Sequence, residues 1–139
     1  MKLVVDSNIF ISALDPNDVF HSQCYPVLEK MLSAQLEAVC PVLVLAEVTC
    51  VIRRRTGSEG VAAAVCHQLG RWSSINWTDV TLDVAESASL LGAQIGVKGG
   101  DAIVLQVALE YGVPLLTLDK EMRLKAPPNV TVITPSDIA

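Results

Sequence analysis

The sequence predicts an α/β fold: a central, mostly parallel five-stranded sheet between two layers of helices, in a single domain spanning residues 1–139. Short apolar segments alternate with longer segments of helical periodicity, and glycine or proline separates most of them. No repeat, low-complexity tract or flexible linker divides the chain. Its length of 139 residues is enough for one compact hydrophobic core.

The first half of the chain is expected to supply two strands and three helices. Pro41 suits the first turn of a helix, because its missing N–H is not needed there. Gly57 suits a helix end, since glycine readily adopts a left-handed backbone, and Ser58 is a typical N-cap. The predicted segments are the strand 2–6, the turn 14–18, the helix 21–35, the strand 36–40 and the helices 41–56 and 58–72.

The second half continues the alternation with three strands and two helices. Gly96 and Gly112 mark the ends of the two helices, and Pro127 and Pro128 precede the last strand. The predicted segments are the strand 75–80, the helices 81–95 and 99–112, and the strands 114–119 and 129–134. Alternation of this kind places ligands beyond the carboxyl ends of the strands.

Composition narrows the class of protein. Hydrophobic residues make up 51% and charged residues 18%, so some apolar surface is expected to remain for a partner. No apolar run approaches the roughly 20 residues of a membrane span, and the first strand is too short for a signal-peptide core. We therefore expect a cytoplasmic protein without membrane contact. The four cysteines form no C-x-x-C pair and lie in apolar segments, which favours buried free thiols.

The net charge of −5 argues against a broad basic surface for nucleic acid. If the protein acts on a polyanion, either a bound divalent cation or a local arginine cluster must supply the positive charge. The only dense positive run is Arg53, Arg54 and Arg55. Arg54 falls two helical turns beyond Glu47 on the same face, which makes the run a candidate for RNA binding. The competing interpretation is a solvated helix terminus.

Four carboxylates are predicted to meet at the carboxyl edge of the sheet. Asp6 ends the first strand and Asp119 ends the strand PLLTL. Asp101 opens a helix after two glycines, and Glu47 lies in the helix that leaves the second strand, where its neighbours at helical spacing are apolar. Two carboxylates about 4 Å apart repel by on the order of 4 kcal/mol, so gathering four favours a bound cation.

Each acid also has a purely structural interpretation. Asp6 could cap a helix with Ser7 and Asn8, and Asp119 could cap the segment DKEMR. Asp101 could stabilise the first turn of its helix, and Glu47 could belong to a buried ion pair. Taken together, however, an all-oxygen set without His or Cys favours magnesium or manganese. Such ions activate water for displacement at phosphorus, so phosphodiester hydrolysis is the expected reaction.

The order of these motifs resembles PIN-domain ribonucleases, and the size of the chain resembles VapC-type toxins of toxin–antitoxin pairs. The motifs are VVDSN, LAEV, GGDAIVLQVA and LLTLDKEM, and they span most of the chain. The resemblance implies a five-stranded parallel sheet, single-stranded RNA as substrate, dimerisation and a small antitoxin that blocks the site.

The same resemblance implies roles for individual residues. Asp6, Glu47, Asp101 and Asp119 would be the metal-binding and catalytic acids. Ser7 and Asn8 would support Asp6, and Thr117 would support the opposite side of the site. The remaining candidates, His21, His67, Trp72, Trp77, Asp15 and Asp18, are interpreted as structural or turn residues.

Three other functions remain open from the sequence. A PIN nuclease can process RNA without being a toxin. A receiver-like or phosphotransferase module is also small, acidic and α/β, but it usually has a second acid after the first strand, where this chain has Asn8. A degenerate domain that only binds a partner would lack some of the acids, whereas all four are present.

Overall fold

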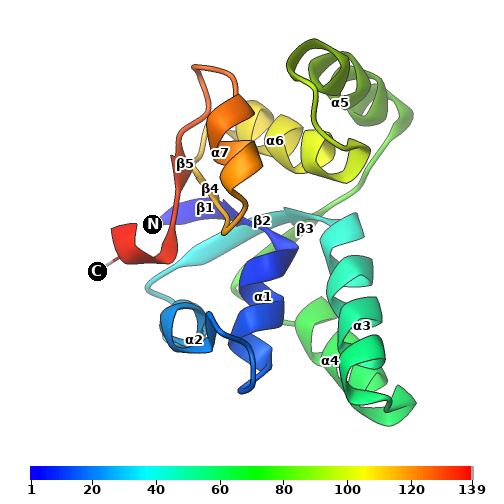
Figure 1. Cartoon of the computed structure of the whole chain (residues 1–139), viewed down its shortest axis with the longest axis vertical. Coiled ribbons are helices and arrows are strands. Elements are labelled where there is room, and N and C mark those ends of the chain that lie inside the picture. The colour runs from blue at the N-terminus through cyan, green and yellow to red at the C-terminus, as the bar shows by residue number, and fades with distance from the viewer. Residues whose placement is uncertain (139) are drawn as a thin grey trace.

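The computed structural model describes residues 1–138 and confirms the predicted architecture (Figure 1). Five parallel strands form one sheet in the order β3-β2-β1-β4-β5. The strands are β1 (Lys2–Val5), β2 (Glu37–Pro41), β3 (Ile75–Thr78), β4 (Leu115–Leu116) and β5 (Val132–Ile133). Because all five are parallel, their carboxyl ends lie along a single edge of the sheet.

Helices cover both faces of the sheet, with α5, α6 and α7 on one side and α1 to α4 on the other (Figure 1). The bounds are α1 (Ser7–Leu14), α2 (His21–Leu32), α3 (Val42–Thr56), α4 (Glu59–Gly70), α5 (Leu82–Ile95), α6 (Gly99–Tyr111) and α7 (Lys120–Lys125), with a short 3₁₀ turn at Pro135–Asp137. Gly57, Gly96 and Gly112 have positive φ and end α3, α5 and α6 as expected.

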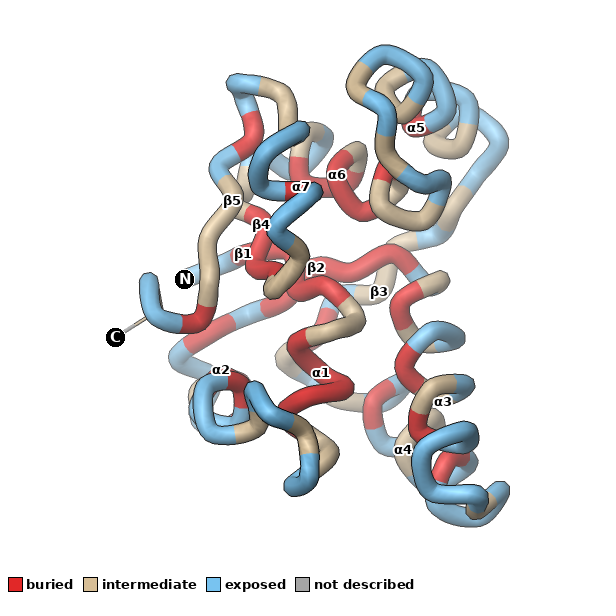
Figure 2. The backbone as a smooth tube through the Cα atoms, in the orientation of Figure 1, coloured by how far each residue is buried: buried red, intermediate tan, exposed pale blue. Residues whose placement is uncertain are grey.

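The core lies along the sheet and the helix faces that touch it. Figure 2 shows the central strands as almost continuously buried, with exposure increasing toward the outer helix turns. Strand β1 buries Leu3, Val4 and Val5 completely. Within the described part of the chain, no helix has both the length and the apolar character needed to cross a membrane.

The structure differs from the predicted segments mainly at α1 and at the two short strands. Residues 9–13 of α1 are all buried, so this segment lacks the polar stripe by which a sequence reveals a surface helix. Strands β4 and β5 keep only two residues each. Backbone hydrogen bonds between neighbouring segments nevertheless continue beyond these short strands, from the N–H of Val4 to the carbonyl of Pro114 and from the N–H of Thr117 to the carbonyl of Ile133.

The cysteine prediction is half right. All four thiols are free, and Cys24 and Cys40 are buried. Cys50, however, is exposed, and Cys66 is only partly covered. Both lie on α3 and α4, whose buried faces are narrow.

Candidate active site at the carboxyl edge of the sheet

Asp6 stands where β1 ends and α1 begins. Its backbone N–H donates to the carbonyl of Leu116 in the neighbouring strand β4, at 3.0 Å. Its Oδ1 accepts a hydrogen bond of 2.8 Å from the N–H of Ser7, so Asp6 does cap α1. The residue is only 5% exposed. A cap at a surface helix end does not need such burial, so capping alone does not explain where this carboxylate lies.

A polar network joins Asp6 to the end of β4. The hydroxyl of Thr117, which is 1% exposed, donates to Oδ2 of Asp6 at 2.7 Å. The side-chain amide of Asn8 donates to Oδ2 of Asp6 at 3.4 Å and to Oγ1 of Thr117 at 3.1 Å. The carbonyl of the same amide accepts from the N–H of Leu118 at 3.2 Å. Asn8 and Thr117 therefore hold the ends of two adjacent strands in register around one carboxylate.

Asp119 enters the site through the same network. Its N–H donates to Oγ1 of Thr117 at 3.0 Å. Its Oδ1 accepts from the N–H groups of Glu121 and Met122, at 2.8 and 3.2 Å, and so caps α7. Asp119 therefore caps α7, as the sequence predicts, and the same residue is a proposed acid of the site.

The surroundings of Glu47 differ from those that the sequence predicts. The buried stripe of α3 consists of Val44, Val48 and Ile52, and Glu47 lies beside that stripe as an exposed residue. Its carboxylate faces the start of α6, since a β-carbon on Gly100 would lie 3.7 Å from Oε2 of Glu47. Glu47 therefore forms the rim of the site. The apolar neighbours in the sequence were a poor guide because they pack to one side of it.

Asp101 is the third residue of α6 and is half-buried. The helix has Lys98 as its N-cap residue, with no side-chain cap bond. The position of Asp101 in the first turn agrees with a favourable helix-dipole contact. That contact does not offset the effects of burial and of the neighbouring acids, which raise the pKa of Asp101.

The carboxylates raise one another's pKa. Burial raises the pKa of Asp6 above its ordinary value, the nearby charge of Asp119 adds to this, and the Thr117 and Ser7 hydrogen bonds oppose it. Partial burial of its carboxyl group, followed by the charges of Asp6 and Asp101, raises the pKa of Glu47, although the residue as a whole is exposed.

Asp101 shows the same effect. Burial, together with the charges of Asp6 and Asp119, raises the pKa of Asp101 to about 6. Lys98 lowers it, but not enough to compensate. Four carboxylates from four separate segments thus act on each other electrostatically at this edge, and within residues 1–138 none forms an ion pair.

The donor chemistry suits a hard divalent cation, although the side chains are not closed around one. Within residues 1–138, no three His, Cys, Asp or Glu side chains are arranged so that they could hold a metal ion. Two of the acids direct oxygens into helix caps and the network instead. The oxygen-only set, its mutual repulsion and its half-buried position are what magnesium or manganese would relieve.

Comparison with known proteins decides the family. The family model described as "PIN domain" matches residues 3–126. The chain belongs to the PIN domain family. A comparison with curated protein sequences gives no match.

Solved structures share the fold of this PIN domain. VapC20 of Mycobacterium tuberculosis, described as a sarcin–ricin loop cleaving toxin, has a TM-score of 0.76 at 17% identity, over 93% of this chain and 98% of that one. A toxin–antitoxin complex from Klebsiella pneumoniae gives 0.65 at 22% identity, over 96% and 97%. VapBC2 from Rickettsia felis, bound to a promoter DNA fragment, gives 0.69 at 16% identity, over 96% and 98%.

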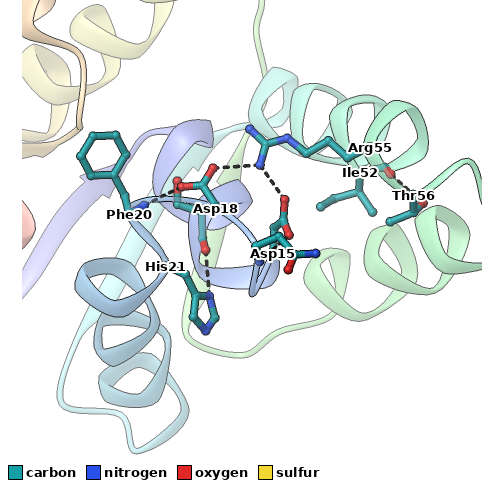
Figure 3. A network of polar contacts seen from close by, with 9 residues as sticks. Asp15, Asp18, Phe20, His21, Ile52, Arg55 and Thr56 are labelled. Atoms are coloured by element: carbon teal, nitrogen blue, oxygen red, sulfur yellow. Dashed lines mark hydrogen bonds and ion pairs between the residues drawn. The ribbon is translucent and has the colours of Figure 1, made fainter.

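The structure does not bring the three arginines of the run 53–55 together on one surface. Nη1 of Arg55 lies 2.8 Å from Oδ2 of Asp15 and 2.8 Å from Oδ2 of Asp18, which ties the end of α3 to the loop between α1 and α2 (Figure 3). Arg53 and Arg54 are exposed. From the sequence, Asp15 and Asp18 are predicted to be turn residues. They do accept turn bonds from Asn17 and Phe20, but the ion pair was not foreseen.

Two charged residues near Asp101 were missed in the sequence. The charge of Glu121 adds to the rise in the pKa of Asp101, and Lys98 opposes it. Their positions offered a signal: Lys98 is three residues before Asp101, and Glu121 is two residues after Asp119. Both looked like ordinary surface residues at helix starts. Trp77 packs against the core and donates from Nε1 to the carbonyl of Leu69, in agreement with a structural role.

Proposed function

We propose that this PIN domain is a metal-dependent endoribonuclease that hydrolyses phosphodiester bonds in single-stranded or structured RNA. The observation that carries the proposal is the group of mutually repelling carboxylates at the carboxyl edge of the sheet, with the pKa of Asp101 raised to about 6. A protein gains nothing in stability from such a group, so a ligand or a reaction is the better reason for it. Membership of the PIN family supports the nuclease class.

The proposed cofactor is magnesium or manganese, held by Asp6, Glu47, Asp101 and Asp119. When bound, the ion would supply Lewis-acid activation of water and stabilise negative charge developing at phosphorus. Thr117 and Asn8 would fix the orientation of Asp6 through the network described above. Ser7 would complete the polar lining beside Asp6. Glu47 at the rim and Asp101 in the first turn of α6 would close the set from the opposite side.

The proposed biological role is the toxin of a toxin–antitoxin pair, acting in the cytoplasm as a homodimer. Structures of the same fold carry names that include a loop-cleaving toxin and a toxin–antitoxin complex, which favours this role. A small antitoxin protein is the expected partner. The alternative is an RNA-processing PIN nuclease with no antitoxin.

Two experiments test the nuclease activity and the toxin role. Purified wild-type protein is incubated with total RNA and Mg²⁺ or Mn²⁺, beside Asp101→Asn and a chelator control. We expect cleavage only by the wild type with metal. Undiminished cleavage by a clean Asp101→Asn preparation would refute the assignment. Induced expression of the same pair of proteins tests the toxin role, since only the wild type should arrest growth.

A receiver-like phospho-acceptor is the remaining alternative class. Incubation with a small phosphoryl donor, followed by measurement of the protein's mass, distinguishes it from a nuclease. We expect no added phosphoryl group.

A further inference from the structure

One face of α3 leads away from the proposed active site. A β-carbon on Gly100, at the start of α6, would lie 3.8 Å from Cδ1 of Leu43 and 3.7 Å from Oε2 of Glu47. Leu43 and Glu47 are one turn apart, so these contacts identify the side of α3 that faces the site. The opposite flank of the helix meets α4, where a β-carbon on Gly70 would lie 3.7 Å from Leu45.

Arg54 lies farther along the same face. Seven residues of α-helix complete nearly two turns, so Arg54 is rotated by only about 20° from Glu47 and displaced by about 10 Å along the axis. Arg54 is exposed, and within residues 1–138 it makes no hydrogen bond or ion pair. Its guanidinium is therefore available to a ligand that starts at the acidic site and follows α3.

The two neighbouring arginines are not equivalent to it. Arg53 is rotated by about 120° from Glu47 and so lies away from the site. Arg55 points toward the loop between α1 and α2, where Asp15 and Asp18 neutralise its charge (Figure 3). Of the one dense positive run in an acidic chain, a single member lies in line with the carboxylates.

We propose that single-stranded RNA extends from the active site along the face of α3 from Glu47 to Arg54, the RNA track, and that Arg54 binds a phosphate of this strand away from the scissile one. This inference rests on the proposed ribonuclease function. A stacked strand advances about 3.4 Å per nucleotide, so about 10 Å corresponds to roughly three nucleotides. A guanidinium is suited to a phosphate because it can donate two parallel hydrogen bonds.

The test compares two variants with the same change of charge, Arg54→Gln and Arg53→Gln. Both are made in an Asp101→Asn background, which keeps the RNA intact, and circular dichroism checks their fold. Fluorescence anisotropy with Mg²⁺ then measures binding of a labelled single-stranded RNA of about 12 nucleotides, which is long enough to reach from the acidic centre past Arg54. The salt concentration is varied, and a dinucleotide competitor reports on binding at the acidic centre alone.

We expect Arg54→Gln to weaken binding of the long RNA about fivefold, and to reduce the slope of log K against log salt by about 0.7, the value for one phosphate contact in a single strand. Arg53→Gln should change binding less than twofold, and Arg54→Lys should recover most of the loss. Competition by the dinucleotide should be the same for both glutamine variants, because it does not reach Arg54.

The track is overturned if the two glutamine variants lose binding of the long RNA equally, or if Arg54→Gln weakens binding of the dinucleotide as much as binding of the long RNA. Either result would leave the ribonuclease proposal intact. Unchanged binding of the long RNA by Arg54→Gln would also overturn the track. If wild-type protein neither binds nor cuts RNA, the proposed function and the track fail together.

Discussion

Two groups of carboxylates in this PIN domain have opposite electrostatic surroundings. Asp15 and Asp18 share the guanidinium of Arg55 at 2.8 Å each. The hydrogen bond from Arg55 lowers the pKa of Asp15, and it also lowers the pKa of Asp18 although partial burial works against it. At the sheet edge the pKa values of Asp6, Glu47 and Asp101 are all raised.

The difference is the presence of a counter-charge. At the loop, the protein supplies its own cation from α3. At the sheet edge it gathers acids from four segments, and the exposed Lys98 lowers the pKa of Asp101 without offsetting the rise. Carboxylates paired with a cation stabilise the fold wherever they occur. Unpaired carboxylates that repel one another cost stability, and they are typical of functional sites.

Asp119→Asn should reduce the rate of metal-dependent RNA cleavage by at least about 100-fold, since it removes a proposed ligand and its charge. Asn keeps an oxygen that can still cap α7, so the fold should persist. Initial cleavage rates and circular dichroism check both points. Asp15→Asn makes the same change in the loop group and should stay within about threefold of wild type. Similar losses in the two variants would remove the distinction between the groups.

Thr117→Val should lower the cleavage rate by about tenfold, a typical effect of removing a residue that orients a metal ligand. The variant deletes the 2.7 Å hydrogen bond to Oδ2 of Asp6, and the pKa of Asp6 should rise further because that bond opposes the effect of burial. A pH–rate profile should shift to higher pH along with the loss. Thr117→Ser retains the hydroxyl and is the matched control; its failure to restore activity would point to packing instead.

The pH dependence of metal binding should follow Asp101. Since the pKa of Asp101 is raised to about 6, its carboxyl group is ionised at pH 7.5 and largely protonated at pH 5. Mg²⁺ or Mn²⁺ affinity, measured by calorimetry, should therefore fall by up to about tenfold per pH unit below 6. Affinity that stays constant from pH 7.5 to 5 would show that Asp101 is not a ligand.

The stability of the metal-free protein should also reflect Asp101, with the opposite sign. A carboxyl group whose folded pKa is raised costs stability above that pKa, and the cost disappears as pH falls toward the ordinary value of 3.8. At pH 7.5, Asp101→Asn should therefore be more stable than wild type by about 1 kcal/mol, after allowing for solvent screening. Thermal unfolding at pH 7.5 and pH 5 measures this, and the difference should shrink at the lower pH.

Arg55→Gln should have the smallest effect, a loss of about 0.5–1 kcal/mol in the free energy of unfolding, because the ion pairs are partly exposed. The lowered pKa values of Asp15 and Asp18 mean that this contribution is present above their ordinary values and is lost as pH falls through the folded ones. Denaturant unfolding at low and high salt measures it. Arg53→Gln, which breaks no ion pair, is the control.

Much of this fold and site was predictable from the sequence. Three glycines correctly predicted the carboxyl ends of α3, α5 and α6, and Pro41 predicted the start of α3. Both signals are local, because they depend on a positive φ or on the missing proline N–H. The alternation of strands and helices implied a parallel sheet, and that sheet placed Asp6, Asp101 and Asp119 at its carboxyl edge. Membership of the PIN family agrees with motifs that can be read in the same sequence.

Only the tertiary structure decided how the side chains are used. It placed Glu47 at the rim instead of in an apolar stripe, and it paired Arg55 with two acids some 40 positions away in the chain. It also showed that Asp6 and Asp119, two acids of the proposed site, cap helices. Backbone preferences depend on neighbours in the chain, so the sequence determines them. Which carboxylate meets a cation depends on contacts between distant segments, and those exist only once the chain has folded.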